Sequence, residues 1–273
     1  MMKKSIAVII PVYNSETTVI NTLESVRLQT YGAANFQIIL VNDGSTDQSL
    51  LLIEEYIKDH PELQFLLFSQ ENGGVSNARN TALRSADADY IALLDADDQW
   101  LPEKIERQMK YLENPAFGID FLACKRTHQQ LLFPYKADKN HLAAITFRRL
   151  MIRTEAQPSS VVFKRKVLKN TGFFSINQRY AEDINYWLKV SLNNKMFILD
   201  EELIFAGGGK RTFGISGLSA NLKEMEKGFQ KNLRDMLLLK RIGWLEYRLY
   251  SGFYTVKYGF RLLRNNYLKL LGK

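Results

Sequence analysis

The first hundred residues alternate continuous apolar runs with segments of helical periodicity, and this alternation constrains the fold more than any other feature. The apolar runs are typical of strands buried on both faces, and they lie at residues 6–12, 36–41, 64–68 and 90–94. The helical segments lie between them, near residues 15–28, 48–57 and 75–84. A β-α-β-α-β-α-β order predicts an α/β fold with a mostly parallel sheet and helices on both faces.

Turn and cap residues indicate where helices begin. Asn14 or Ser15 can cap the first helix, residues 45–48 (Ser-Thr-Asp-Gln) resemble a capping box, and Pro102 suits the first position of a helix over 103–112. The second half is less regular. It predicts strands at 119–124, 160–163, 196–199 and 203–206, helices at 142–151 and 183–192, and a helical remainder at 220–273.

The composition excludes disorder and a disulfide-rich scaffold. Hydrophobic residues make up 46% of the 273 residues and charged residues 24%, which is ordinary for a globular protein. The single cysteine, Cys124, rules out an internal disulfide and suits a reducing compartment. The apolar run near the N-terminus is too short for a signal-peptide core or a membrane span. We therefore expect a cytoplasmic protein, or one bound peripherally to the inner face of the cytoplasmic membrane.

Nearly all of the net charge of +8 lies in the last 34 residues, where eight basic residues face one acid. Eight aromatic residues are interleaved with them, and an apolar stripe is expected at Val256, Phe260, Leu263 and Tyr267. Basic and aromatic side chains on a helix suit the headgroup region of an anionic membrane. A helical cap on the body and a homodimer contact are the alternatives. Nucleic acid is not expected as a partner, because no recognition motif accompanies the charge.

Three acidic clusters follow predicted strands or begin a predicted helix, at residues 42–47, 95–98 and 182–183. Ligands of parallel α/β sheets bind beyond the carboxyl ends of the strands, so these positions are candidate site residues. Each cluster alone can also be a capped turn or a helix N-terminus that favours acids. The cluster at 95–98 is the hardest to explain in that way, since its three carboxylates repel each other unless a cation or donor lies among them.

Five motifs occur in the order and spacing of one family. They are Pro-Val-Tyr-Asn at residues 11–14, Val-Asn-Asp-Gly-Ser-Thr-Asp at 41–47, Asn-Gly-Gly at 72–74 with Ala-Arg-Asn at 78–80, Leu-Asp-Ala-Asp-Asp at 94–98, and Glu-Asp at 182–183. Together they resemble glycosyltransferase family 2, which has the GT-A fold, over about residues 5–215. One departure is Ala88-Asp89, where many members have a glycine.

The resemblance implies a domain organisation. A glycosyltransferase domain is expected over 1–219, with a nucleotide-sugar half of about 1–115 and an acceptor half of about 116–219. Outside the resemblance, helical pattern and composition predict a basic aromatic helical extension over 220–273.

The resemblance also implies roles for the donor side of the site. Asp43 would accept a hydrogen bond from the donor base, usually uracil, and Pro11 and Tyr13 would shape that pocket. Arg79 would lie near the base and the acids, although a surface arginine is the alternative. Asp95 would face the ribose. Asp97 would bind Mn²⁺ or Mg²⁺, which take carboxylate and diphosphate oxygens as ligands.

The acceptor side depends on the last motif. By resemblance, Asp183 would be the general base that takes the proton of the acceptor hydroxyl, with Glu182 as the weaker candidate. Lys210 and Arg211 lie near the family's flexible loop over the donor diphosphate, and Arg211 would bind that diphosphate; a solvated loop arginine is the alternative.

The function that follows is the inverting, metal-dependent transfer of one sugar from a nucleotide diphosphate sugar, expected to be UDP-linked, to an acceptor hydroxyl. A lipid-linked glycan in bacterial surface polysaccharide synthesis is the expected acceptor. Two alternatives stay open. One is a transferase acting on polyprenyl phosphate, and the other is a non-catalytic nucleotide-sugar-binding assembly subunit.

Overall fold

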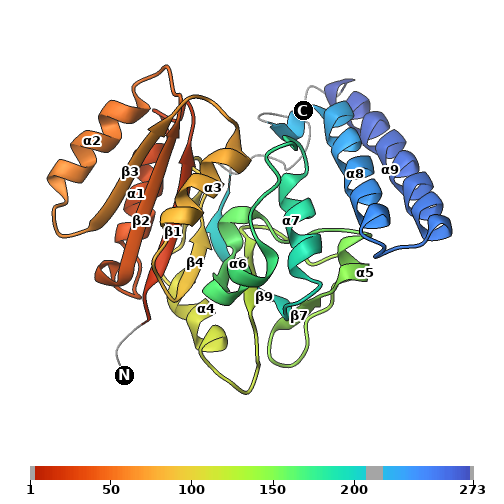
Figure 1. Cartoon of the computed structure of the whole chain (residues 1–273), viewed down its shortest axis with the longest axis horizontal. Helices are drawn as coiled ribbons and strands as arrows, with labels where there is room; N and C mark the ends of the chain where they lie inside the picture. The colour runs from red at the N-terminus through yellow and green to blue at the C-terminus, as the bar shows by residue number, and fades with distance from the viewer. Residues whose placement is uncertain (1–3, 207–217, 271–273) are drawn as a thin grey trace. The chain divides into compact units, whose positions relative to one another are not determined.

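The computed structural model describes residues 4–206 and 218–270, coloured in Figure 1. The chain divides into two compact units, which are described in turn. The first contains Met1–Ile176 and Tyr186–Gly209, and the second contains Asn177–Asn185 and Lys210–Lys273. The predicted domain boundary at residues 219 and 220 stays a prediction.

The first half of the sheet follows the predicted alternation. Four parallel strands lie in the order β3-β2-β1-β4 in the sheet, and a helix lies between each strand and the next along the chain. The elements in chain order are β1 (Ile6–Val12), α1 (Val19–Arg27), η1 (Ala33–Asn35), β2 (Phe36–Asp43), α2 (Ser49–Asp59), β3 (Gln64–Gln70), α3 (Val75–Ser85) and β4 (Tyr90–Leu93). This confirms the β-α-β-α-β-α-β order.

The second half of the sheet is mixed, and its order continues from β4 as β8-β6-β9-β5, with β7 also pairing with β9. β8 runs antiparallel to β4 and β6, whereas β6 and β9 are parallel. The elements are β5 (Gln99–Trp100), α4 (Lys104–Leu112), β6 (Phe121–Arg126), β7 (Leu142–Ile145), α5 (Phe147–Leu150), η2 (Pro158–Ser160), β8 (Val162–Lys164), α6 (Arg165–Thr171) and β9 (Met196–Phe205).

Helices lie on both faces of the first half of the sheet, as predicted. Alternate residues of β1, such as Ile6 and Val8, belong to a buried cluster that also contains apolar residues of α1, α2 and α4. The intervening residue Ala7 is equally buried on the other face, where α3 contacts β1 and β2. Because both faces are covered, the strands are continuous apolar runs rather than alternating ones.

Several predictions of local structure were wrong. The helix expected over 142–151 is instead strand β7 followed by the short helix α5, because residues 142–145 pair with β9. The strands expected at 196–199 and 203–206 form one strand, β9. α4 begins at Lys104, two residues after Pro102. The first two outcomes depend on pairing between distant strands, which local periodicity does not report.

The predicted helix caps were also wrong. α1 begins at Val19 without a side-chain cap, and neither Asn14 nor Ser15 caps it. The capping box at residues 45–48 does not form. Instead the Asp47 carboxylate accepts hydrogen bonds from the backbone N–H and the hydroxyl of Ser49, the first residue of α2.

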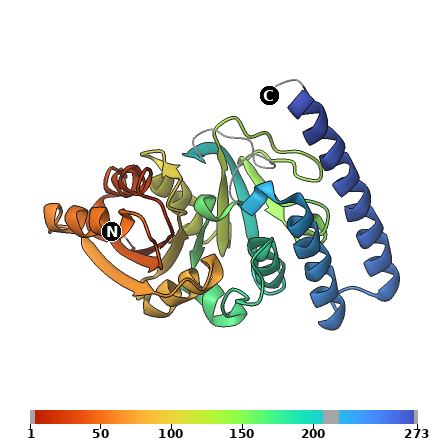
Figure 2. The same ribbon diagram turned by 90° about the horizontal axis from the view of Figure 1, so that it is seen from above.

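The second unit contains two long helices, α8 (Leu222–Leu238) and α9 (Trp244–Leu270), preceded by the short helix η4 (Leu218–Ala220). α8 and α9 lie side by side in both views of the chain (Figures 1 and 2), and the rings of Phe229 and Tyr254 stack between them at 5.2 Å. The helical extension is confirmed. No helix within residues 4–206 or 218–270 combines the length and apolarity needed to cross a bilayer.

Candidate active site

The donor-side candidates come together at one edge of the sheet. β1 pairs in parallel with both β2 and β4, so the carboxyl ends of the three strands meet there. Half-buried Pro11 and exposed Tyr13 lie at the end of β1, Asp43 ends β2, and Asp95 follows β4. This is the edge at which parallel α/β sheets bind ligands.

The loops after β1 and β2 hold each other. The Asn14 Oδ1 accepts a hydrogen bond from the backbone N–H of Thr46 at 2.8 Å, and the N–H of Asn14 donates to the Ser45 hydroxyl at 3.1 Å. The N–H of Ser15 donates to the Ser49 hydroxyl at 2.8 Å. Asn14, Ser45 and Ser49 therefore join these two loops rather than cap helices.

Asp43 is buried and orders the Asn-Gly-Gly turn before α3. Its Oδ1 accepts from the Gly73 N–H at 2.9 Å and from the Gln70 side-chain amide at 2.7 Å, and its Oδ2 accepts from the Gly74 N–H at 2.8 Å. An ionised carboxylate accepts about four hydrogen bonds, so capacity for one further donor remains. Gly44 is also required, because at φ +73° a Cβ there would lie 2.9 Å from the Asn72 nitrogen.

Arg79 links α3 to the acidic loop at residues 95–98. Its Nη2 donates to the Asp95 Oδ1 at 2.6 Å, and its guanidinium carbon lies 5.4 Å from the centroid of the Phe174 ring. Only 2% of Arg79 is exposed, which excludes the alternative of a surface arginine. Arg79 therefore supplies a positive charge beside the three carboxylates of the acidic loop.

The rest of the acidic loop is held by hydroxyl groups. The Ser159 hydroxyl accepts from the Asp95 N–H at 3.0 Å and donates to the Asp98 carboxylate. The Thr22 hydroxyl in α1 donates to the backbone carbonyls of Ala96 and Asp98 at 3.0 and 2.9 Å. Asp97 is exposed, while its neighbours on either side, Ala96 and Asp98, are buried. The loop is therefore fixed by hydroxyl groups on both sides of the exposed residue Asp97.

Sequence reasoning missed Ser159 and Thr22. No motif marks Ser159, which reaches the loop from the 3-10 helix η2. Thr22 carried a weak signal, because it is a polar residue on the apolar face of a helix that also buries Val19, Leu23 and Val26.

The carboxylates of the acidic loop at residues 95–98 suit Mn²⁺ or Mg²⁺, which prefer oxygen ligands. Within the described ranges 4–206 and 218–270, no cluster of three or more His, Cys, Asp or Glu residues could hold a metal by itself. Mg²⁺ is commonly bound by one or two carboxylates, with further oxygens from substrate phosphates. The exposed Asp97 provides such a carboxylate at the ligand-binding edge of the sheet.

A buried lysine lies behind the loop. The Lys104 amine is 4.2 Å from the centroid of the Trp100 ring, and Trp100 donates from its indole N–H to the Ser159 carbonyl at 2.8 Å. Burial lowers the pKa of Lys104 to about 8 and raises the pKa of nearby Cys124 to about 12. The amine stabilises the ring that holds Ser159, and no motif or periodicity predicts this contact.

The acceptor-side candidates Glu182 and Asp183 belong to the second unit and begin α7 (Glu182–Val190). Glu182 is buried and Asp183 is half-buried. The Asp183 Oδ1 accepts from the N–H of Ile184 at 2.8 Å. Acidic side chains are favoured at a helix N-terminus by the helix dipole. Lys210 and Arg211 lie outside the described residues.

The aromatic pair that follows these acids has a structural role in the first unit. Tyr186 and Trp187 are fully buried. Tyr186 stacks on Phe174 at 4.1 Å and donates to the Gly172 carbonyl at 2.8 Å. The pair anchors the later part of α7 in the core.

Comparison with known proteins identifies the family. The model of glycosyl transferase family 2 matches residues 7–182, which is more than half of the chain. The chain belongs to this family. This confirms the resemblance seen in the five motifs.

Two relatives show how far the likeness extends. An uncharacterized glycosyltransferase of Rickettsia felis is 30% identical over 210 residues, which are 76% of this chain and 34% of that protein. The poly(ribitol-phosphate) beta-N-acetylglucosaminyltransferase TarS of Staphylococcus aureus is 25% identical over 206 residues, 75% of this chain and 35% of TarS. This chain thus spans about a third of the length of the first curated relatives it matches.

Solved structures confirm the GT-A-type fold. The crystal structure of TarS 1–349 in complex with UDP-GlcNAc gives a TM-score of 0.68 at 20% identity, covering 92% of this chain and 71% of that chain. The mannosyltransferase PcManGT from Pyrobaculum calidifontis, in complex with GDP-Man and Mn²⁺, gives 0.69 at 19% identity, covering 89% and 66%.

Proposed function

We propose that this protein is an inverting glycosyltransferase that moves a sugar from a nucleotide diphosphate sugar to an acceptor hydroxyl and requires Mn²⁺ or Mg²⁺. The observation that carries the proposal is the acidic loop at residues 95–98. Arg79 and Ser159 hold the carboxylates on either side of Asp97, which leaves Asp97 exposed at the ligand-binding edge of the sheet.

The proposed donor-side roles rest on the family resemblance and are supported by this geometry. Asp43 accepts a hydrogen bond from the base, and Pro11 and Tyr13 form the edge of its pocket. Asp95, held by Arg79, faces the ribose. Asp97 would hold the divalent cation, which when bound stabilises the charge on the departing nucleoside diphosphate. Arg211 is proposed to bind the diphosphate on sequence grounds alone.

The acceptor-side role belongs to Asp183. Its carboxylate takes the proton of the acceptor hydroxyl as that oxygen bonds to the anomeric carbon, and Glu182 is the weaker candidate. A single displacement inverts the anomeric configuration, as it does in inverting glycoside hydrolysis.

The relatives favour a UDP-linked donor and a bacterial surface glycan as the acceptor. TarS is crystallised with UDP-GlcNAc and is named for transfer to poly(ribitol-phosphate). We propose a comparable acceptor for this chain, in the form of a lipid-linked glycan used in surface polysaccharide synthesis.

We also propose that the protein is cytoplasmic and binds the inner face of the membrane peripherally through α9. Six apolar residues at alternating spacings of four and three are 42% to 69% exposed: Leu249, Phe253, Val256, Phe260, Leu263 and Tyr267. Tyr254 faces the opposite way and is buried against α8. α9 carries five basic residues and one acid. A second copy of α9 would be repelled by that charge, whereas an anionic lipid surface would be attracted.

A panel of UDP-, GDP-, CDP- and dTDP-sugars tests the proposed reaction. With Mn²⁺ present, we expect the chain to release a nucleoside diphosphate from at least one UDP-sugar. Proton NMR of the sugar released to water should give the inverted anomer before mutarotation. Binding of UDP-sugars without release under any condition would instead support a non-catalytic nucleotide-sugar-binding subunit.

A further inference from the structure

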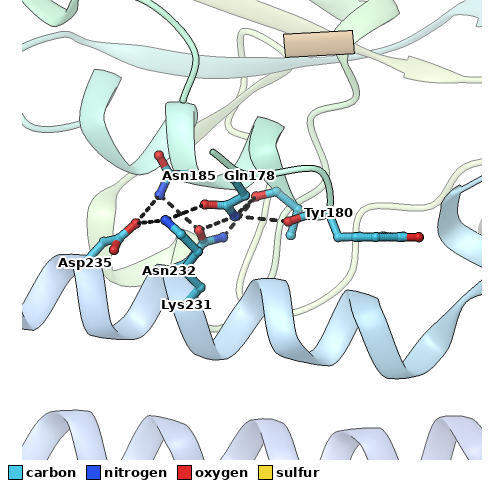
Figure 3. A network of polar contacts seen from close by, with 7 residues as sticks. Gln178, Tyr180, Asn185, Lys231, Asn232 and Asp235 are labelled. Carbon is cyan, nitrogen blue, oxygen red and sulfur yellow. Dashed lines mark hydrogen bonds and ion pairs between the residues drawn. The ribbon is translucent and has the colours of Figure 1, made fainter. Parts of the chain in front are cut away.

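Within the second unit, α8 holds the short segment that carries Glu182 and Asp183. Figure 3 shows side chains of this segment and of α8 meeting in one polar network. The Asn232 side-chain amide donates to the Ala181 carbonyl at 3.0 Å, and the Gln178 amide donates to the carbonyls of Tyr180 and Ala181 at 3.0 and 3.1 Å. The bonds therefore converge on the two carbonyls that directly precede Glu182.

Asn232 also accepts hydrogen bonds from side chains at both ends of the segment. The Asn232 Oδ1 accepts from Gln178 at 2.7 Å and from Asn185 at 3.0 Å. Asn185 donates in addition to Asp235, which pairs with Lys231 at 2.8 Å. Both ends of residues 178–185 are therefore tied to α8.

The fit between α8 and the segment is close. At Gly228 of α8, a Cβ would lie 2.3 Å from the Tyr180 carbonyl oxygen and 3.3 Å from the Ala181 Cβ. Ala181 has φ +55°, a left-handed conformation that residues other than glycine seldom adopt. Such a conformation persists only where the surroundings hold it, and here Asn232 and Gln178 do so.

We propose that Gly228 and Asn232 of α8 are positioning residues for the general base, because they fix the left-handed turn from which Glu182 and Asp183 extend. The inference deepens the proposed function and depends on Asp183 acting as the base. Polar contacts aimed at the turn directly before the acids set the direction in which Asp183 extends. An error of about 1 Å in such a group can reduce a rate by about 10²-fold.

A pair of identical substitutions tests the proposal. Gly228→Ala places a methyl group against the Tyr180 carbonyl, whereas Gly252→Ala, on α9, meets nothing within 4 Å. Both changes raise helix propensity by a similar amount. We expect Gly228→Ala to lower kcat by about tenfold or more with an unchanged Kd for UDP, and Gly252→Ala to leave both unchanged. Equal kcat values for the two variants would overturn the proposal.

A double-mutant cycle separates positioning of Asp183 from general support of the fold. In the Asp183→Asn background, Gly228→Ala should have little further effect on kcat, because the group it positions is already inactive. If the double variant instead shows the product of the two single losses in kcat, the inference is overturned. If Gly228→Ala does not fold, Asn232→Ala replaces it in the same cycle, since it removes the bond to the Ala181 carbonyl without adding bulk.

The cycle also distinguishes this inference from the proposed function. Full activity of Asp183→Asn would reject Asp183 as the base and the proposed mechanism with it. A large loss in Asp183→Asn together with wild-type kcat in both α8 variants would reject only the positioning role.

Discussion

The acidic loop at residues 95–98 and the segment that carries Glu182 and Asp183 are held in different ways. The loop is held through its carboxylates, by an ion pair with the Arg79 guanidinium and a hydrogen bond from the Ser159 hydroxyl. The backbone carbonyls of the segment accept hydrogen bonds from two neutral amides, those of Gln178 within the segment and Asn232 on α8. The proposed cation site needs its negative charges balanced, whereas the proposed general base needs a fixed direction, which the turn before it sets. The difference therefore matches the two proposed roles.

The largest expected effect is on the donor side. Asp97→Asn keeps the side-chain size and removes the charge proposed to hold the metal. Turnover should fall by about 10³-fold, since a metal contributes several kcal/mol to transition-state stabilisation, while thermal unfolding changes little. Asp87→Asn, at another exposed carboxylate, is the control. Unchanged turnover of Asp97→Asn at saturating donor would remove Asp97 from this role.

On the acceptor side, Asp183→Asn should leave UDP affinity close to that of the wild type and lower kcat by about 10²-fold, a typical contribution of a general base. Isothermal titration with UDP and steady-state kinetics on one preparation measure both quantities. Glu182→Gln is the matched variant and should lose less. A loss confined to Glu182→Gln would reverse the assignment of the base.

The two long helices of the second unit should also have different functions: α8 positions the proposed base, and α9 binds the membrane. Phe260→Ser combined with Leu263→Ser should weaken binding to phosphatidylglycerol vesicles by about thirtyfold, based on roughly 1 kcal/mol for each partly inserted side chain. Donor hydrolysis should not change. The paired control is Leu28→Ser with Leu51→Ser, at two exposed residues of the first unit, the first directly after α1 and the second on α2. Wild-type protein that does not bind these vesicles at low salt would contradict the membrane proposal.

A smaller effect is expected from the hydroxyl that bridges the loop. Ser159→Ala removes the contacts to the Asp95 N–H and the Asp98 carboxylate, and should lower kcat/KM for the donor by about tenfold, within the range for hydrogen bonds to charged groups. Ser160→Ala removes only a bond to the Gln157 carbonyl and should behave as the wild type. Equal effects of the two variants would mean that Ser159 supports the fold and not the loop.

The sequence predicted those parts of the molecule that depend on local pattern. The order of the first four strands and the position of Asp43 and Asp95 after them follow from apolar periodicity and adjacent motifs. The contacts that hold these residues were not predictable in this way, because they join distant positions. Thr22 reaches Ala96 across 74 residues, and Asn232 reaches Ala181 across 51. The strand at residues 142–145 was mistaken for a helix for the same reason, since its partner lies in β9.

The most direct test of the central claim is the release of nucleoside diphosphate from a UDP-sugar by the full chain, with and without divalent cation. We predict that release requires Mn²⁺ or Mg²⁺, stops when EDTA removes the cation, and resumes when Mn²⁺ is added in excess. Release that continues at the same rate in EDTA would contradict the metal-dependent transfer assigned to Asp97. No release from any nucleotide sugar, in the presence of Mn²⁺, would contradict the assignment as an enzyme.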